Sequence, residues 1–303
     1  MIPVIEVGGT HVTAALVDPA DGRVAGRIHR PLDPEGDAGD ILGAIRRCAD
    51  RLDAAEGTRW GVAVPGPFDY ARGIALYAGV GKFEALYGTD VRAVLLAQLR
   101  RRPDDVVFLN DAHAFLMGEW SVGAARGHRR AVGITLGTGV GSAFLADGRI
   151  VDKGPGVPPE GRMDLTEADG APLEESVSRR AILARFGEPS ADVRDIAELA
   201  RAGGRRARRV LDDAFVTLGA ALGPRLTAFG ATTVVVGGSM ARSWDLVAPA
   251  LRAGLTDGGW APDAAASDDS PRRLARHTRA VQPAGLASDA ALIGAARAVA
   301  VRD

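Results

Sequence analysis

The feature that most constrains the fold of this chain is a pattern of strands and turns that occurs twice. In each copy, an apolar strand leads into a turn rich in glycine and threonine, a second strand, an Asp-Gly turn and a third strand. The first turn of such a unit lets backbone N–H groups approach a phosphate closely. A chain that uses this unit twice is expected to form two related domains that face a shared cleft. The first copy covers residues 1–30 and includes Gly8, Gly9 and Thr10, and the second covers residues 131–151 and includes Gly137, Thr138 and Gly139.

The strand predicted at residues 106–109 ends in two short polar residues, Asn110 and Asp111. Four apolar residues in a row are typical of a buried strand, and an apolar helical pattern begins almost immediately afterwards. Open α/β sheets bind ligands at the carboxyl ends of their strands, so both polar residues stand where a substrate could lie. Asp and Asn are also strong helix N-caps, and a purely structural role for Asp111 is the alternative.

Two further predicted strands end in glycine turns. Strand 60–64 leads into Pro65-Gly66-Pro67, and strand 232–236 leads into Gly237-Gly238-Ser239 and a helix. A glycine turn that opens a helix is well placed for a nucleotide, because the helix N-terminus presents unpaired N–H groups. Each turn alone is a weak signal, since tight glycine turns are common.

Composition excludes several classes of function. The formal net charge is −1, so no global field favours nucleic acid or an anionic membrane. The single cysteine, Cys48, excludes an internal disulfide and a cysteine-rich zinc site. The N-terminus does not resemble a signal peptide, and no apolar run reaches the roughly 18 residues that a membrane span needs. We therefore expect a soluble, cytoplasmic protein with no nucleic-acid or membrane partner.

Six motifs, taken in order, resemble one protein family. They are residues 6–10 (Glu-Val-Gly-Gly-Thr), 64–67 (Val-Pro-Gly-Pro), 109–112 (Leu-Asn-Asp-Ala), 136–141 (Leu-Gly-Thr-Gly-Val-Gly), 236–239 (Val-Gly-Gly-Ser) and 288–296 (Ser-Asp-Ala-Ala-Leu-Ile-Gly-Ala-Ala). Over nearly its whole length the chain resembles the ROK family of sugar kinases, within the actin/hexokinase-like ATPase superfamily.

The resemblance implies an α/β fold of the two-domain actin-like ATPase (ribonuclease H-like) type, with an interdomain cleft. Residues 1–111 would form the N-terminal domain, joined by the C-terminal helix at about residues 288–303. Residues 112–287 would form the C-terminal domain. The family also leads us to expect a homodimer.

The activity implied by the resemblance is transfer of the γ-phosphate of ATP to a hydroxyl, the 6-OH, of a hexose or amino sugar. Asp111 would be the general base, and Gly66 and Asn110 would bind the sugar. Phosphoryl transfer needs mainly positioning and charge neutralisation, with a carboxylate at the nucleophile. Mg²⁺ would be held mainly by ATP, near Glu6. The residues expected to contact ATP are Glu6, Gly8, Gly9, Thr10, Gly137, Thr138, Gly139, Gly237 and Gly238.

Three departures from the family pattern bear on the site. Glu6 stands where the family usually has Asp, and its extra methylene could shift a contact held through Mg²⁺ or water. Residues 156–163 stand where many members carry a Gly-Glu-x-Gly-His segment and zinc-binding cysteines. They contain neither histidine nor cysteine, so no zinc is expected, and Glu160 is taken as the matching glutamate and a sugar ligand. Residues 80–83 (Val-Gly-Lys-Phe) replace an Asn-Leu pair that touches the sugar in many members.

Glu174 follows Leu173 and precedes Ser178, as in the family's Leu-Glu and later Ser, which makes Glu174 an expected sugar ligand. An acid stabilised by the dipole in the first turn of a helix is the alternative. Losing one sugar ligand and altering another should change which sugar fits, and the sequence leaves that sugar open. Tyr70, Lys82 and Arg162 could reach a ligand, but the sequence does not decide it.

Three other functions compete with the kinase. A DNA-binding repressor is disfavoured, because the phosphate loop begins at Glu6 and leaves no room for a helix-turn-helix before it. The second alternative is a sugar- or nucleotide-binding protein that has lost catalysis. Glu6 in place of Asp and the missing histidine favour it, whereas the retained Asn110-Asp111 pair argues against it. A phosphotransferase of the same superfamily acting on a non-sugar is the third.

Overall fold

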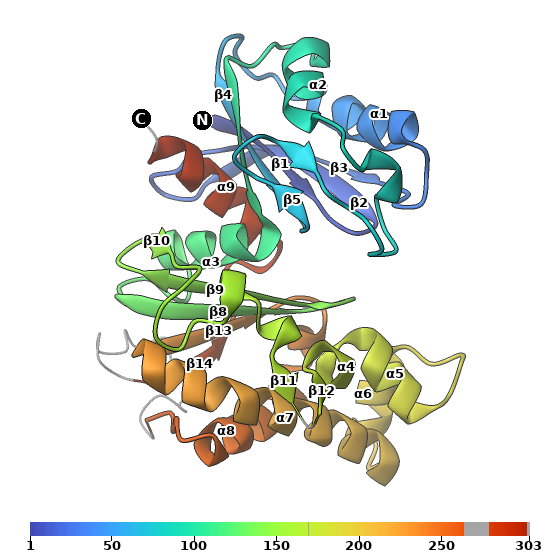
Figure 1. The fold of residues 1–303 in the computed structure, drawn as a ribbon, viewed down its shortest axis with the longest axis vertical. Helices are drawn as coiled ribbons and strands as arrows, with labels where there is room; N and C mark the ends of the chain where they lie inside the picture. Colours follow the sequence, from blue (N-terminus) through green and yellow to red (C-terminus); the bar gives the residue numbers. More distant parts are fainter. Residues whose placement is uncertain (169, 264–278, 302–303) are drawn as a thin grey trace. The chain divides into compact units, whose positions relative to one another are not determined.

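The computed structural model describes residues 1–168, 170–263 and 279–301, which form two compact units (Figure 1). Unit 1 contains Met1–Gly123 and Ser288–Asp303, and unit 2 contains Ala124–Ala287. The polar loop expected at residues 262–273 lies almost wholly outside the described residues. Most of the strand expected at residues 274–281 does so too.

Unit 1 is built on a five-stranded sheet of order β3-β2-β1-β4-β7. Its strands are β1 (Ile2–Val7), β2 (His11–Val17), β3 (Val24–Pro31), β4 (Arg59–Val64) and β7 (Asp105–Asn110), with the small hairpin β5 (Phe68–Asp69) and β6 (Ile74–Ala75). Its helices are α1 (Ala38–Ala49), α2 (Val91–Gln98), α3 (Asp111–Val122) and α9 (Ala290–Ala300). β1, β2 and β3 are antiparallel neighbours, whereas β1, β4 and β7 run parallel. The carboxyl ends of β1, β4 and β7 therefore meet at one edge.

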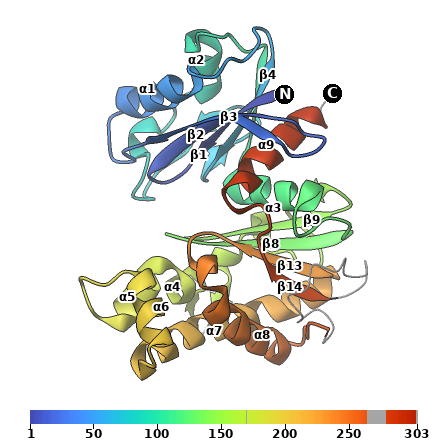
Figure 2. The same cartoon turned by 180° about the vertical axis from the view of Figure 1, so that it is seen from behind.

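Helices cover both faces of the unit 1 sheet. Side chains alternate along each strand, so each strand contributes side chains to both faces. On one face Ile5, Val62 and Phe108 share a core with residues of α1 and α2, including Ile41 and Leu95. The opposite face packs against α9 (Figure 2). The parallel strands β1, β4 and β7 are mostly buried, as is typical of parallel strands, whereas β3 is largely exposed.

Helix α3 belongs to unit 1 because it packs closely on α9 (Figure 2). A Cβ atom added to Gly118 would lie 2.0 Å from the carbonyl oxygen of Ala290, and one added to Gly294 would lie 1.8 Å from that of Ala114. Only glycine permits this approach of the two backbones. Unit 1 thus extends past Asp111, where the sequence placed the domain boundary, to Gly123.

Unit 2 repeats the plan with a sheet of order β10-β9-β8-β13-β14. Its strands are β8 (Arg130–Leu136), β9 (Val140–Ala146), β10 (Arg149–Ile150), β13 (Thr233–Gly237) and β14 (Ala280–Pro283), with the hairpin β11 (Glu167–Ala168) and β12 (Ala171–Pro172). Its helices are α4 (Glu174–Val177), α5 (Arg179–Phe186), α6 (Val193–Arg201), α7 (Arg205–Phe229) and α8 (Trp244–Asp257). β8, β9 and β10 are antiparallel, and β13 lies parallel between β8 and β14. The predicted repeat of one strand plan is confirmed.

The core of unit 2 lies between this sheet and the long helix α7. Ile134 and Val236 are fully buried there with Leu218 and Leu222 of α7 and Leu251 of α8. Helix α7 begins with a run of basic residues, at positions 205, 206, 208 and 209. No helix within the described residues is both long and apolar enough to cross a membrane.

Candidate active site

The site residues predicted in unit 1 lie at the carboxyl edge of the three parallel strands. Register pairs Glu6 of β1 with Ala63 of β4, and Val64 of β4 with Asn110 of β7. Gly66 follows β4 by two residues, and Asp111 is the first residue of α3. Glu6, Gly66, Asn110 and Asp111 are therefore brought together by parallel pairing, although more than a hundred residues separate the first from the last.

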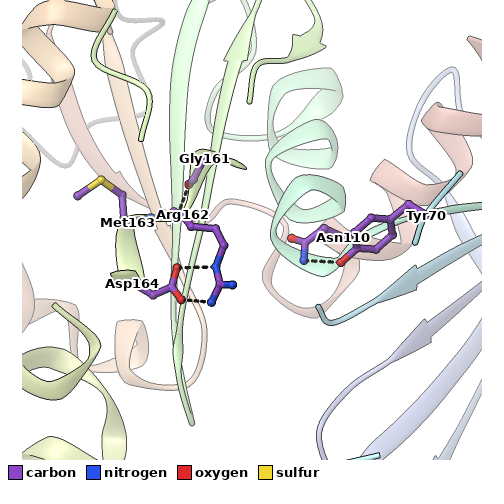
Figure 3. A network of polar contacts seen from close by, with 7 residues as sticks. Tyr70, Asn110, Gly161, Arg162, Met163 and Asp164 are labelled. Atoms are coloured by element: carbon purple, nitrogen blue, oxygen red, sulfur yellow. Dashed lines mark hydrogen bonds and ion pairs between the residues drawn. The ribbon is translucent and has the colours of Figure 1, made fainter. Parts of the chain in front are cut away.

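Asn110, and not Asp111, is the N-cap of α3. The Asn110 Oδ1 accepts from the backbone N–H groups of Ala112 at 2.9 Å and His113 at 3.3 Å. The Asn110 Nδ2 donates to the Tyr70 hydroxyl at 3.0 Å (Figure 3). The capping role considered for Asp111 thus falls to its neighbour, and the Asp111 Oδ1 accepts from the Ala112 N–H at 2.8 Å.

Two half-buried carboxylates, Glu6 and Asp111, influence each other at this edge. Burial and the Asp111 carboxylate raise the pKa of Glu6 to about 7, against the opposing charge of Arg27. Burial also raises the pKa of Asp111, while the Lys82 ammonium and the Ala112 N–H act to lower it. Both carboxyl groups therefore hold a proton to higher pH than ordinary exposed carboxyl groups do.

The raised pKa of Glu6 predicts a pH-dependent stability that Glu6→Gln should remove. Because the folded-state pKa of about 7 exceeds the ordinary value of 4.5, protonation of Glu6 favours the folded state. The stabilisation is complete below pH 4.5 and is lost as the pH rises through 7. At about 1.4 kcal/mol per pKa unit, it is on the order of 3 kcal/mol. Thermal melts of both proteins from pH 5 to 8 should diverge, with Glu6→Gln relatively more stable at pH 8; parallel curves would contradict the prediction.

The first glycine turn connects β1 to β2. Gly8 donates its N–H to the carbonyl of His11 at 2.8 Å, which closes the turn over Gly9 and Thr10. The His11 ring lies against Gly8, where an added Cβ would be 2.6 Å from the His11 Cε1. A Cβ on Gly9 would meet no atom within 4 Å, so this side of the turn is open to a ligand.

The second and third glycine turns lie side by side at the carboxyl edge of the unit 2 sheet. Register pairs Gly237 of β13 with Thr135 of β8. A Cβ on Gly238, whose φ is +90°, would lie 2.2 Å from the carbonyl oxygen of Leu136. The turn after Leu136 is closed by the Gly137 N–H, which donates to the Gly139 carbonyl at 3.0 Å. Two motifs a hundred residues apart thus meet in unit 2.

Glu174 also reaches this edge of unit 2. It begins the four-residue helix α4, and its Oε1 lies 2.5 Å from the position that a Cβ of Gly139 would take. Its carboxylate and that of Glu160 both act on the Arg162 guanidinium and, with the stronger Asp164 contact, raise the pKa of Arg162. Glu160 is exposed and has φ of +57°.

The segment that carries Arg162 is anchored on β9. Ser142 Oγ donates to the Gly161 carbonyl at 2.6 Å and accepts from the Met163 N–H at 2.9 Å. Arg162 then binds the Asp164 carboxylate through Nη2 at 2.5 Å and Nε at 3.3 Å (Figure 3). A segment without periodicity in the sequence is therefore held by specific polar contacts.

Comparison with known proteins identifies the family. The ROK family model matches residues 3–300. The chain belongs to the ROK family. The resemblance inferred from the six motifs is confirmed.

ROK relatives of known name share moderate identity with the chain. It is 27% identical over 283 residues to a glucokinase of Thermotoga maritima, covering 84% of this chain and 86% of that one. Among solved structures, the ROK hexokinase from Thermus thermophilus has a TM-score of 0.73 at 24% identity, covering 99% of this chain and 98% of that one. A ROK family glucokinase from Streptomyces griseus, in complex with glucose and AMPPNP, has a TM-score of 0.73 at 22% identity over 97% of both chains. The predicted two-domain actin-like ATPase fold is confirmed.

Within the described residues no group of three or more His, Cys, Asp or Glu side chains could hold a metal ion by itself. Cys48 is buried in unit 1, with its thiol donating to the carbonyl of Ile28 at 3.3 Å. That no zinc binds remains a prediction.

One positively charged side chain near the site, that of Arg27, was not predicted from the sequence. Arg27 of β3 acts on Glu6, and it pairs with Asp289 and donates to Ser288 Oγ at 3.1 Å. The connection spans 261 residues and links the outer strand to the Ser-Asp pair before α9. Lys82, left undecided by the sequence, is the cation that acts on Asp111.

Proposed function

We propose that this ROK protein is an ATP-dependent sugar kinase that phosphorylates the 6-OH of a hexose or amino sugar, with Asp111 as general base. The observation that carries the proposal is the half-buried Asp111 carboxylate at the carboxyl edge of β7, next to Asn110 and Gly66. Because Asn110 supplies the helix cap, the Asp111 carboxylate is available for chemistry. The named kinases among its ROK relatives support the same reaction class.

In the proposed reaction, Asp111 accepts the proton of the sugar hydroxyl as that oxygen bonds to the γ-phosphorus. The bond between the γ-phosphorus and the β,γ-bridging oxygen breaks, and ADP leaves. A base must be ionised to act; burial raises the pKa of Asp111, and the Lys82 ammonium and the Ala112 N–H oppose that rise. Gly66, Asn110, Glu160 and Glu174 are proposed to bind the sugar.

The glycine turns fit the phosphates of ATP. At Gly9 and Gly137 an added Cβ would meet no atom within 4 Å, so both backbones are open to a close approach. Glu6 offers carboxylate oxygens of the kind that Mg²⁺ prefers. Mg²⁺ bound with ATP would neutralise charge on the transferred phosphoryl group. The proposed ATP contacts are Glu6, Gly8, Gly9, Thr10, Gly137, Thr138, Gly139, Gly237 and Gly238.

Coupled release of ADP with Mg-ATP across a panel of hexoses and amino sugars tests the proposal. Release that depends on one sugar is expected, and the preferred sugar would identify the substrate. Phosphorus NMR of the product would show which hydroxyl carries the phosphate. Binding of ATP or sugar by calorimetry without any ADP release would instead favour the non-catalytic binding protein.

We further propose a cytoplasmic homodimer without nucleic-acid or membrane partners. These features rest on the ROK family and on the near-zero net charge of the chain. Sedimentation of the purified protein at micromolar concentration, with and without duplex DNA, tests the oligomeric state and the absence of DNA binding together.

A further inference from the structure

The side-chain amide of Asn110 is fixed from two directions. Its Oδ1 must face α3, because two backbone N–H groups, those of Ala112 and His113, donate to it. Its Nδ2 must therefore face the other way, toward the Tyr70 hydroxyl at 3.0 Å (Figure 3). The hydrogen-bond network thus leaves one orientation for the amide, since the flipped amide would set its N–H donors against those of α3.

Tyr70 is itself held by the hairpin of β5 and β6. Its ring packs against Phe68 with centroids 5.4 Å apart, and Phe68 packs against Phe108 of β7 at 5.1 Å. The Gly73 N–H donates to the Asp69 carbonyl at 2.7 Å and closes the turn that follows Tyr70. The hydroxyl that meets Asn110 is thus carried by a ring packed into an aromatic cluster.

Gly66 meets both of these side chains. A Cβ added there would lie 3.3 Å from the Tyr70 hydroxyl and 3.9 Å from Asn110 Nδ2. Three separate segments, the Pro-Gly-Pro turn, the hairpin and the end of β7, thus converge on one amide. Two of the three, Gly66 and Asn110, belong to the sugar site of the proposed function.

Asn110 keeps little capacity for a substrate. An asparagine side chain has one carbonyl acceptor and two N–H donors. The acceptor and one donor are used within unit 1, and among the described residues the second Nδ2–H has no partner. At this position the site can therefore donate one hydrogen bond to a substrate, and it offers no acceptor.

We propose that Tyr70 is a positioning residue of the sugar site, which fixes the Asn110 amide so that its second Nδ2–H is presented to an oxygen acceptor of the sugar. The inference rests on the proposed kinase function and deepens it. A fixed donor discriminates between sugar epimers, because a misplaced hydroxyl leaves a polar group unpaired.

Tyr70→Phe tests the inference, because it removes only the hydroxyl. The KM for the preferred sugar should rise about 3- to 10-fold, the range expected for one hydrogen bond. The KM for ATP and kcat should stay within about twofold, since the lost interaction orients the sugar equally before and during transfer. The preference for one hexose over its epimers should fall by a similar factor.

Tyr77→Phe is the matched control. Tyr77 belongs to the same aromatic cluster, and its buried hydroxyl donates to the Pro65 carbonyl at 3.0 Å rather than to Asn110. It should lower the melting temperature without changing the KM for sugar. A second control uses Asn110→Ser, which keeps a capping side chain but removes the amide. Adding Tyr70→Phe to Asn110→Ser should change the KM for sugar no further, because the group that Tyr70 orients is gone.

Three results would overturn the inference, and they are distinguishable. An unchanged KM for sugar in Tyr70→Phe, with an active parent protein, would remove the role of Tyr70 and leave the kinase intact. An equal rise of KM in Tyr77→Phe would assign the effect to a loosened hairpin. A parent protein that turns over no sugar in the panel would remove the proposed function and this inference together.

Discussion

Asp111→Asn is expected to lower sugar-dependent ADP release by about 10²- to 10⁴-fold, the contribution typical of a positioned general base. An amide has the size of the carboxylate but cannot take a proton from the sugar hydroxyl. The Asn oxygen can still accept the Ala112 N–H, and the helix cap at Asn110 is untouched. The variant should therefore fold and bind sugar and ATP, and steady-state ADP release at saturating substrate measures the loss.

Asp105→Asn is the matched control for this prediction. Asp105 lies at the opposite end of the same strand, β7, where its carboxylate pairs with Arg92 at 2.9 Å. Exposed ion pairs contribute little to the free energy of unfolding, so the loss of this partly exposed pair should lower stability only slightly. Activity should stay within about twofold of that of the parent protein. Activity of Asp111→Asn within threefold of the parent protein would show that Asp111 is not the base.

The sequence could predict the candidate residues of unit 1 because they follow strand ends. A four-residue apolar run before Asn110 and Asp111 indicates a buried strand with its carboxyl end at the polar pair, and parallel pairing then brings Gly66 and Glu6 to the same edge. In unit 2, Gly137 follows β8 and Gly237 ends β13, and the parallel pairing of these two strands brings the two glycine turns to one edge. In each case the apolar runs and the glycine turns indicate where the strands end, and strand pairing in the sheet brings those ends together.

Contacts between side chains from distant segments could not be predicted in this way. The charge of Arg27 acts on Glu6, and the same side chain binds Ser288 in the segment before α9; neither strand spacing nor composition specifies these contacts. The Tyr70–Asn110 hydrogen bond likewise depends on how the β5–β6 hairpin folds over the Pro-Gly-Pro turn. The extent of unit 1 depends on such contacts too, since the packing of α3 on α9 joins residues about 175 positions apart.

Glycine motifs pose a different difficulty, because a glycine can serve a ligand or the fold. Gly137 and Gly238 illustrate the two cases within unit 2. A Cβ on Gly137 would meet nothing within 4 Å, and its φ is not in the left-handed region. Gly238 has φ of +90°, and its Cβ would meet the Leu136 backbone at 2.2 Å. The sequence predicts one role, ATP binding, for both residues. In the structure, the backbone conformation and packing require glycine at position 238 but not at position 137.

Gly238→Ala is accordingly expected to destabilise the protein strongly. A left-handed conformation costs an alanine about 1–2 kcal/mol, and forcing a methyl group against backbone costs typically about 1–3 kcal/mol more. A combined loss of about 3 kcal/mol or more is large against a total stability of about 5–15 kcal/mol. The melting temperature should fall by on the order of 10 °C, measurable by circular dichroism without any ligand.

Gly137→Ala is the matched control for Gly238→Ala, because it adds the same methyl group at a glycine with open space around it. It should melt within about 2 °C of the parent protein, because the added methyl group enters open space. If the turn contacts ATP as proposed, the same methyl group should stand between the backbone N–H groups and the phosphates, and the KM for ATP should rise at least tenfold. An unaltered KM for ATP would remove Gly137 from the nucleotide site. A Gly238→Ala protein with parental melting temperature but weakened ATP binding would show that Gly238, too, serves the ligand rather than the sheet.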